Sequence, residues 1–420
     1  MGEANRESGS RLTDHLSIGV LTKTVPRFLI DEVLAETGKK EKRSRLLPAH
    51  VVVYFVMALA LFRDGYDEVM RHVVHGLRFA RTWSQRWTVP STGAMTQARA
   101  PLGEAPMAEL FARIAQPLAS PGTPGAWLGR WRLMAIDGVM LDIPDTAANL
   151  AEYEKVASGT RRPYPQVKIV GLGECGTHAL IDASIGSIRQ GERELADPLT
   201  SSVTPNMLVT ADRGFFSYPL WLAYMLTGTD LLWRLTKTTQ LPVLQLLPDG
   251  SYLSEISRIK SPGKTRIPLD TVRDPHLATH LPVRVIEYQV HTGAENEEPE
   301  TFRLITTITD HHEVNAAELA SAYAQRWEFE SSLREIECQL LTPGGTLRSK
   351  SPELVRQEIW GILLTHYSIR VFMTEAADTT EIDPDRISMI RAINIIRRTV
   401  TDGPGFSPLH DSDSKMPGND

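Results

Sequence analysis

The chain has 420 residues and a formal net charge of −6, with 42% hydrophobic and 23% charged residues. This composition is that of an ordinary globular protein of two or three domains, and it excludes a chain that is disordered throughout. The two cysteines, Cys175 and Cys338, are too few for a disulfide scaffold, so a reducing, cytoplasmic location is expected.

Neither a signal peptide nor a membrane span is expected from the sequence. Residues 1–11 are polar and lack the apolar core of a signal peptide. The most apolar run, residues 51–62, is shorter than the stretch of about 20 residues that a membrane-spanning helix needs. Because polar sequence flanks this run, it predicts a buried core helix and no membrane contact.

Charge is distributed unevenly along the chain. Residues 1–125 contain 16 Lys and Arg against 12 Asp and Glu, so their balance is +4 and that of the remainder is −10. A basic N-terminal part followed by an acidic part is typical of a DNA-binding domain followed by a domain with a carboxylate site. A solvated basic surface would give the same count.

Residues 1–125 are predicted to be helical. Apolar residues recur at helical spacing after Pro26, after Pro48 and again over residues 67–77. Residues 120–125, Ser-Pro-Gly-Thr-Pro-Gly, form a linker that is the clearest domain boundary in the chain.

One short helix of this region is a candidate DNA-reading element. Residues 90–92 have the character of a helix start, and the helix that follows is polar on one side. Preceded by another helix, it would form a helix-turn-helix in which Gln97 and Arg99 face a DNA groove. The alternative is an ordinary exposed helix.

Beyond the linker the pattern changes to strands. Apolar runs of strand length predict strands at residues 133–137, 166–172, 179–185, 207–211 and 231–235. Helix-like segments at 192–201 and 218–226 lie between them. Alternating β-branched and aromatic residues predict further strands at 252–259, 283–290 and 302–309. Two strong helices are predicted to follow, at 315–340 and 352–377.

Two of these strands carry an aspartate where they are expected to end. Residues 133–136 are an unbroken apolar run, which predicts a strand covered on both faces, and Asp137 follows before a glycine. Asp212 follows the strand at 207–211 in the same way. If the two strands are neighbours, these carboxylates lie side by side and can hold a metal ion. A turn cap at Asp137, or an ion pair or helix cap at Asp212, is the alternative.

A third candidate lies on the helix predicted at 315–340. Tyr323, Arg326 and Glu330 are three and four residues apart, so they share one helix face. A helix face that contacts a DNA phosphate would explain this combination. Arg would form two hydrogen bonds to phosphate oxygens, Tyr would donate to another oxygen, and Glu would bind a metal ion. A ladder of exposed i,i+4 ion pairs is the alternative.

Two other motifs resemble cofactor-binding or metal-binding patterns, but neither has the sequence context that such a site needs. Residues 171–176 spell Gly-x-Gly-x-x-Gly after a strand, but a dinucleotide site needs a helix to begin there. The following residues, 177–184, are strand-like, so we predict a hairpin turn. His311, His312 and Glu313 lack the spacing of a zinc site and are predicted to lie in a loop.

Three parts of the chain together resemble the DDE transposases of bacterial insertion sequences, in the family of insertion sequence four. The resemblance covers about residues 28–398, and the matching residues are Asp137, Asp212-Arg213-Gly214-Phe215, Tyr323, Arg326 and Glu330. The last three match the family's Tyr-x2-Arg-x3-Glu-x6-Lys signature, in which Glu337 stands at the position of the Lys.

The resemblance implies an α/β fold with a ribonuclease H-like catalytic core, a β-rich insertion and an all-α DNA-binding region in front. The implied limits are 1–125 for the helical DNA-binding region, 126–239 for the first part of the core, 240–301 for the insertion, 302–402 for the second part of the core with the Glu330 helix, and 403–420 for a disordered tail.

The resemblance also implies chemistry and partners. Asp137, Asp212 and Glu330 would be the catalytic residues and would bind Mg²⁺ or Mn²⁺, since carboxylates are hard oxygen ligands. Two such ions would assist cleavage of double-stranded DNA at terminal inverted repeats and transfer to target DNA, without ATP. A homodimer is expected in the synaptic complex, in a bacterial cytoplasm and on the nucleoid when bound. The expected DNA-contacting residues are Tyr323, Arg326, Arg213, Gln97 and Arg99.

Glu337 is the one departure from the signature. The family's Lys is expected to touch DNA phosphate, and a carboxylate there would repel it. A relative that binds DNA but is catalytically impaired is therefore one alternative function. A metal-dependent nuclease that cleaves without strand joining is the other.

Overall fold

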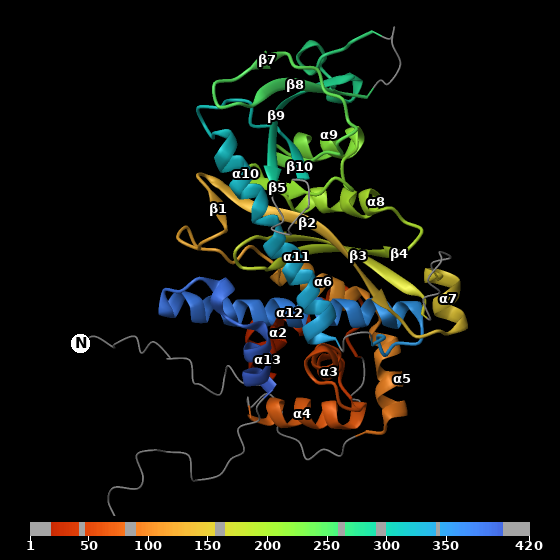
Figure 1. The fold of residues 1–420 in the computed structure, drawn as a ribbon. Helices are drawn as coiled ribbons and strands as arrows, with labels where there is room; N and C mark the ends of the chain where they lie inside the picture. Colours follow the sequence, from red (N-terminus) through yellow and green to blue (C-terminus); the bar gives the residue numbers. More distant parts are fainter. Residues whose placement is uncertain are drawn as a thin grey trace, which may run out of the picture.

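The computed structural model describes residues 18–41, 47–79, 90–155, 164–258, 265–290, 300–341 and 345–397. The tail expected at 403–420 lies outside these residues. Within them, a helical part and a sheet-containing part are separated by one long helix, α12 (Pro352–Thr380), which crosses the middle of the molecule (Figure 1).

The described front region is helical, as predicted. Its helices are α1 (Ile18–Thr24), α2 (Arg27–Glu36), α3 (Ala49–Leu61), α4 (Tyr66–Phe79), α5 (Thr92–Leu102) and α6 (Ala105–Ile114). Residues 51–61 of α3 are all buried, which confirms the core helix predicted from the apolar run. α3 packs on α12 so closely that a Cβ on Gly361 would lie 2.7 Å from Cγ1 of Val56.

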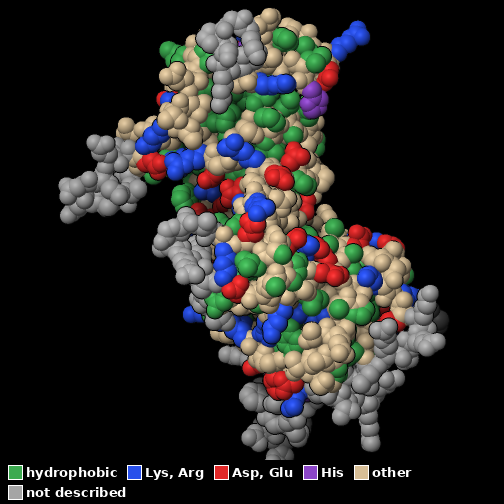
Figure 2. Space-filling view, turned by 90° about the vertical axis from the view of Figure 1, so that its right-hand side faces the viewer, with side chains coloured by type: hydrophobic (Ala, Val, Ile, Leu, Met, Phe, Trp, Pro, Cys, Tyr) green, Lys and Arg blue, Asp and Glu red, His purple; other side chains and the backbone are tan. Residues whose placement is uncertain are grey.

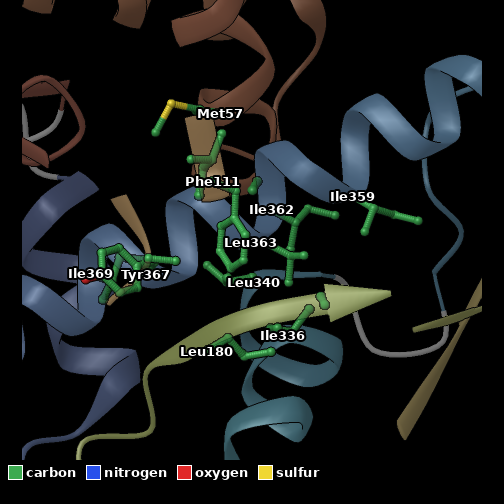
Figure 3. Close-up of a cluster of buried hydrophobic side chains, with 14 of the residues drawn as sticks. Met57, Phe111, Leu180, Ile336, Leu340, Ile359, Ile362, Leu363, Tyr367 and Ile369 are labelled. Carbon is green, nitrogen blue, oxygen red and sulfur yellow. The ribbon is translucent and has the colours of Figure 1, made fainter. Parts of the chain in front are cut away.

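The front helices share one hydrophobic core with the C-terminal part of the chain. In Figure 3, Ile359, Ile362 and Leu363 of α12 lie between the front helices and the sheet. Their neighbours there include Met57 of α3, Phe111 of α6, Leu180 of a sheet strand, and Ile336 and Leu340. Burying each such side chain stabilises the fold by about 1.5–3 kcal/mol. The front region therefore depends on α12 for its core. A last helix, α13 (Met389–Arg397), which no sequence pattern predicted, also packs on α12.

The central sheet has the arrangement that the resemblance implies. Its strands are β2 (Trp131–Asp142), β3 (Gln166–Glu174), β4 (Leu180–Ser187), β5 (Met207–Ala211) and β6 (Asp230–Arg234). They lie in the order β4-β3-β2-β5-β6. β3 pairs antiparallel with both β2 and β4, whereas β5 pairs parallel with both β2 and β6. A three-stranded meander followed by parallel strands is a ribonuclease H-like α/β core.

The segment expected as an insertion extends this same sheet. β7 (Gln245–Leu246), β8 (Tyr252–Ser257) and β9 (His280–Val290) join the core through β10 (Glu300–Thr306), which pairs with both β9 and β6. A short strand, β1 (Trp127–Leu128), pairs with β2. Three-residue 3₁₀ turns occur at Leu269–Thr271, Pro275–Leu277 and Pro384–Arg386.

Helices cover both faces of the core strands. One face carries α8 (Glu192–Ala196), the 3₁₀ helix Asp197–Ser202 and α9 (Tyr218–Leu226); the other carries α10 (Ala316–Ala324), α11 (Arg326–Glu335) and the π-helical turn Ile336–Leu340. α7 (Ala147–Tyr153) packs against α12. Successive side chains of a strand point to opposite faces. Leu133 and Ala135 accordingly join the core under α11, and Met134 and Ile136 join the core under α9, which explains the unbroken apolar run.

The Gly-x-Gly-x-x-Gly motif is a hairpin, as predicted, and its glycines make room for a helix. β3 ends at Glu174, and the chain turns at Gly176, whose φ of +78° favours glycine. A Cβ on Gly173 would lie 2.0 Å from Cε2 of Phe329, so the ring of Phe329 lies directly on the β3 backbone. Phe329 belongs to α11, which is therefore held close to the sheet.

Replacing Gly173 with Ala is expected to lower the free energy of unfolding by about 1–3 kcal/mol, because the added methyl group overpacks the contact with Phe329. Urea denaturation measures this change. The matched control is Gly122→Ala, where a Cβ would meet nothing within 4 Å; it should change stability by less than about 0.5 kcal/mol. Equal stability of the two variants would show that α11 does not depend on this close approach.

Candidate active site

Asp137 and Asp212 occupy neighbouring positions on two parallel strands. The register of β2 and β5 pairs Ile136 with Ala211, so Asp137 on β2 lies beside Asp212, the first residue after β5. The prediction that Asp137 ends its strand was wrong: β2 continues to Asp142, because β3 pairs with it beyond the point where β5 stops. The prediction that the two carboxylates come from neighbouring strands is confirmed.

Each aspartate is held by the backbone that follows it. Oδ1 of Asp137 accepts a hydrogen bond of 2.8 Å from the N–H of Gly138. Oδ1 of Asp212 accepts one of 2.6 Å from the N–H of Gly214. These bonds fix one oxygen of each carboxylate.

Arg326 and Glu330 approach these carboxylates from α11. Nη1 of Arg326 lies 3.0 Å from Oδ2 of Asp137, and its Nη2 lies 3.9 Å from Oε2 of Glu330. Arg334, one turn further along, lies 3.4 Å from the other oxygen of Glu330. The continuous helix predicted over 315–340 is broken at Gln325, where α10 ends and α11 begins. Arg326 therefore starts a new helix that carries Glu330 to the two aspartates.

One cavity of about 340 Å³ collects these side chains. It is lined by Asp137, Gly138, Val139, Asp212, Arg326, Glu330, Leu333, Arg334 and Glu337. Glu337, at the position of the family's Lys, thus faces the same space as the three carboxylates. On the face drawn in Figure 2, acidic and basic side chains gather between the sheet-containing part and the helical part.

The electrostatics of the cavity favour a cation. Burial raises the pKa of Asp137, and the carboxylates of Asp212 and Glu330 raise it further. The N–H of Gly138 and the guanidinium of Arg326 act in the opposite direction. A half-buried carboxylate beside two other negative charges is stabilised in its ionised form when a divalent cation binds. Oxygen ligands of this kind fit Mg²⁺ or Mn²⁺.

Tyr323 does not face this cavity, and its expected contact with phosphate is wrong for this structure. Its side chain is 1% exposed, and its hydroxyl points at the carbonyl oxygen of Ala211, 3.4 Å away. Burial raises the pKa of Tyr323. Its ring lies beside Arg326, with Cζ of the guanidinium 5.8 Å from the ring centroid, and Tyr323 supports the end of β5 from the interior.

Arg99 is likewise unavailable to DNA, which corrects its predicted role. It is 1% exposed, and its donors bond to Oε1 of Gln357 at 2.9 Å, the hydroxyl of Tyr66 at 2.7 Å and Oγ of Ser349 at 2.9 Å. These bonds join α5 to α4 and α12. Gln97 is exposed and lines a surface hollow together with Lys39 and Lys40.

Arg213 is exposed and lies beside the cavity rather than in it. It lines a second hollow, of about 1080 Å³, with Arg193 and Arg258. Among the tryptophans, Trp233 is buried in the core and Trp327 is 53% exposed on α11.

Another group of potential metal ligands is a buried hydrogen-bonded network. One atom each of His178, Glu328 and Asp385 lies within 4.8 Å of the others. Nδ1 of His178, however, accepts from Arg370 at 2.8 Å, and its Nε2 lies 2.8 Å from Oδ1 of Asp385, so both ring nitrogens already have neighbours within the protein. Burial and the neighbouring Asp385 raise the pKa of Glu328. His311 and His312 lie in a turn, as predicted.

In the described part of the chain, no single helix has both the length and the apolar composition needed to cross a membrane. The pair α3 and α4 reaches the composition only when joined across a bend of 117°.

Two family models match the chain. "Insertion element 4 transposase N-terminal" matches residues 15–112, and "Transposase DDE domain" matches residues 131–367. The chain is 31% identical over 385 residues to transposase InsG for insertion sequence element IS4 from Escherichia coli (strain K12), covering 90% of this chain and 82% of InsG. It is 26% identical over 250 residues to the putative transposase InsZ of the same organism, covering 59% of this chain and 78% of InsZ.

Among solved structures, the chain is similar to the cryo-EM structure of the piggyBac transposase synaptic complex with hairpin DNA. The identity is 11% and the TM-score 0.47, over 91% of this chain and 79% of that chain.

Proposed function

Because the chain belongs to the insertion element 4 family of DDE transposases, we propose that it cleaves the ends of an insertion sequence and joins them to target DNA. Asp137, Asp212 and Glu330 are the proposed catalytic and metal-binding residues. The observation that carries this proposal is their meeting in one cavity from two parallel strands and a helix.

In the proposed reaction, water attacks a phosphate at the element's end, the bond from phosphorus to O3′ breaks, and a 3′-hydroxyl is freed. That hydroxyl then attacks a phosphate of the target DNA, whose own bond from phosphorus to O3′ breaks and leaves a 3′-hydroxyl on the target strand. Mg²⁺ or Mn²⁺, when bound, supplies charge stabilisation for the attacking and leaving oxygens.

The chain's own residues orient the phosphate in this reaction. Asp137 and Asp212 are fixed by the N–H groups that follow them, and Glu330 is fixed by the packing of Phe329 on β3. Arg326 is 8% exposed in its side chain and presents its guanidinium at the cavity. An arginine fork binds two phosphate oxygens at once, so Arg326 is the proposed phosphate clamp.

Double-stranded DNA is the proposed partner, bound as terminal inverted repeats and as target, by a homodimer. The exposed Gln97 and Arg213 keep their proposed DNA contacts, since each lines an open hollow on the surface. Binding by the whole chain should weaken steeply with salt, because phosphate contacts release counterions.

Product analysis of purified protein with end-containing DNA and Mn²⁺ tests the proposal. Joined strands are expected in addition to cleaved ends. Cleaved ends without any joined product would favour the metal-dependent nuclease, whose site would look the same. DNA binding without cleavage would favour the impaired relative, for which Glu337 is the feature to examine.

Replacing Glu337 with Lys is expected to tighten binding to cleaved ends roughly threefold to tenfold at low salt and to raise cleavage. The reason is that Glu337 lines the cavity beside Glu330, where a negative charge repels phosphate and a positive charge attracts it. Binding isotherms at two salt concentrations, with cleavage assays in Mn²⁺, measure the change.

The neutral variant Glu337→Gln should give an intermediate affinity. Asp378→Lys makes the same change in net charge on the exposed end of α12, outside the cavity, and serves as the control. If Asp378→Lys tightens binding as much as Glu337→Lys does, the effect comes from net charge alone and Glu337 has no place beside the DNA.

A further inference from the structure

Glu192 is a carboxylate that no sequence motif singled out, yet it lies close to the glycines that follow both aspartates. Its Oε1 would be 3.1 Å from a Cβ on Gly138, and its Oε2 would be 3.4 Å from a Cβ on Gly214. Oδ1 of Asp212 lies 2.9 Å from that same point at Gly214. The two glycines that follow the aspartates therefore leave open the space between Glu192 and Asp212.

The position of Glu192 is set from both sides. Its neighbour Arg193 donates from Nε to the carbonyl oxygen of Gly214 at 2.8 Å, which ties the start of α8 to the Asp212 loop. On the other side, Nζ of Lys168 on β3 donates to the carbonyl oxygen of Gln190 at 2.7 Å. These two hydrogen bonds fix the start of α8 to β3 and to the loop that contains Asp212.

Glu192 itself is only partly exposed, and no hydrogen bond or ion pair joins its side chain to the described residues. A carboxylate is seldom left half-buried without a partner, because its desolvation is then uncompensated. Its neighbour in space, Asp212, has the same charge, and within the described ranges no basic side chain forms an ion pair with Glu192.

An independent observation indicates that this site is built around a ligand. Arg326, whose side chain is more than nine-tenths buried and lines the cavity, has an Nε atom without a hydrogen-bond partner among the described residues. Buried guanidinium donors are normally all satisfied. Carboxylates that share a cavity with a guanidinium fit a cation bound together with a phosphate.

We propose that Glu192 is a fourth acidic residue of the candidate active site, which shares a divalent cation with Asp212 on the side away from Glu330. This inference rests on the proposed function, because it assumes that Asp137 and Asp212 hold metal. It assigns the start of α8 a role that the family signature does not contain. It also explains why glycine follows each aspartate within two residues: a side chain there would fill the space between the carboxylates.

The test is Mn²⁺ binding by the full chain without DNA, measured from the free Mn²⁺ signal in electron paramagnetic resonance. Glu192→Gln is expected to weaken the binding of one Mn²⁺ ion by about tenfold, as removal of groups around a metal site commonly does. Glu194→Gln is the matched control, since Glu194 is exposed on the same short helix and contacts Gln190 instead. It should bind Mn²⁺ like the natural protein.

A second measurement separates this inference from the proposed function. Asp137→Asn should also weaken Mn²⁺ binding. If it does and Glu192→Gln binds Mn²⁺ normally, Glu192 is no part of the site although the proposed function stands. If both variants bind Mn²⁺ like the natural protein, the proposed metal site itself is wrong. Thermal unfolding of each variant shows whether lost binding is merely lost folding.

Discussion

Asp137→Asn is expected to abolish strand cleavage, by about three orders of magnitude or more, while leaving the affinity for DNA nearly unchanged. The substitution keeps the shape of the side chain but removes the charge that holds the metal, and metal stabilisation of transferring phosphate supplies several kcal/mol. Single-turnover cleavage of end-containing DNA in Mn²⁺, beside a binding isotherm, measures both quantities.

The same variant should be at least as stable as the natural protein at neutral pH. Burial and two nearby carboxylates raise the pKa of Asp137, so the ionised form is disfavoured in the folded state relative to the unfolded chain. Folding with the charged side chain therefore becomes less favourable as the pH rises above the ordinary pKa of Asp. A neutral Asn removes that penalty, and loss of cleavage cannot then be ascribed to unfolding.

Asp142→Asn is the control on the same strand. Asp142 accepts from Nε2 of Gln166 at 2.7 Å and does not line the cavity. The Asp142→Asn variant should cleave DNA at the rate of the natural protein. Cleavage by Asp137→Asn at more than a tenth of the natural rate would remove Asp137 from the chemistry, and the proposed mechanism with it.

Arg99→Met is expected to lower the free energy of unfolding by about 3–5 kcal/mol, the largest stability effect that we predict. Methionine fills similar space but leaves Gln357, Tyr66 and Ser349 without the donors that satisfy them in the core. Because those partners come from α12, from α4 and from the approach to α12, the whole front region should loosen. The midpoint of urea denaturation, at unchanged slope, measures this loss.

Gln97→Ala on the same helix is the control, since its exposed side chain should change stability by less than about 0.5 kcal/mol. The pair also separates two roles for α5. If Arg99 read DNA, Arg99→Met would lower DNA affinity without moving the denaturation midpoint. That result would contradict the buried network and restore the role first expected from the sequence.

Much of the core could be predicted from sequence because its determinants are local. The strand at 207–211 and the helix at 218–226 were predicted with the bounds that the structure has. An unbroken apolar run, or an amphipathic one, needs no distant partner to be recognised, since its burial follows from its own composition. For the same reason Asp137 and Asp212 could be singled out: each interrupts an apolar strand with a charge.

The tertiary structure alone decided which polar residues face the site. Arg99 and Tyr323 read like surface residues, and only partners elsewhere in the fold bury them; Gln357 follows Arg99 by 258 residues. The break at Gln325 has no strong local signal, and Tyr323 is buried beside Arg326 without lining the cavity that Arg326 lines. Glu192 shows the converse, because only the folding of α8 onto the Asp212 loop brings its carboxylate there. Burying a polar group is unfavourable unless a partner compensates it, so its position depends on residues that no local pattern contains.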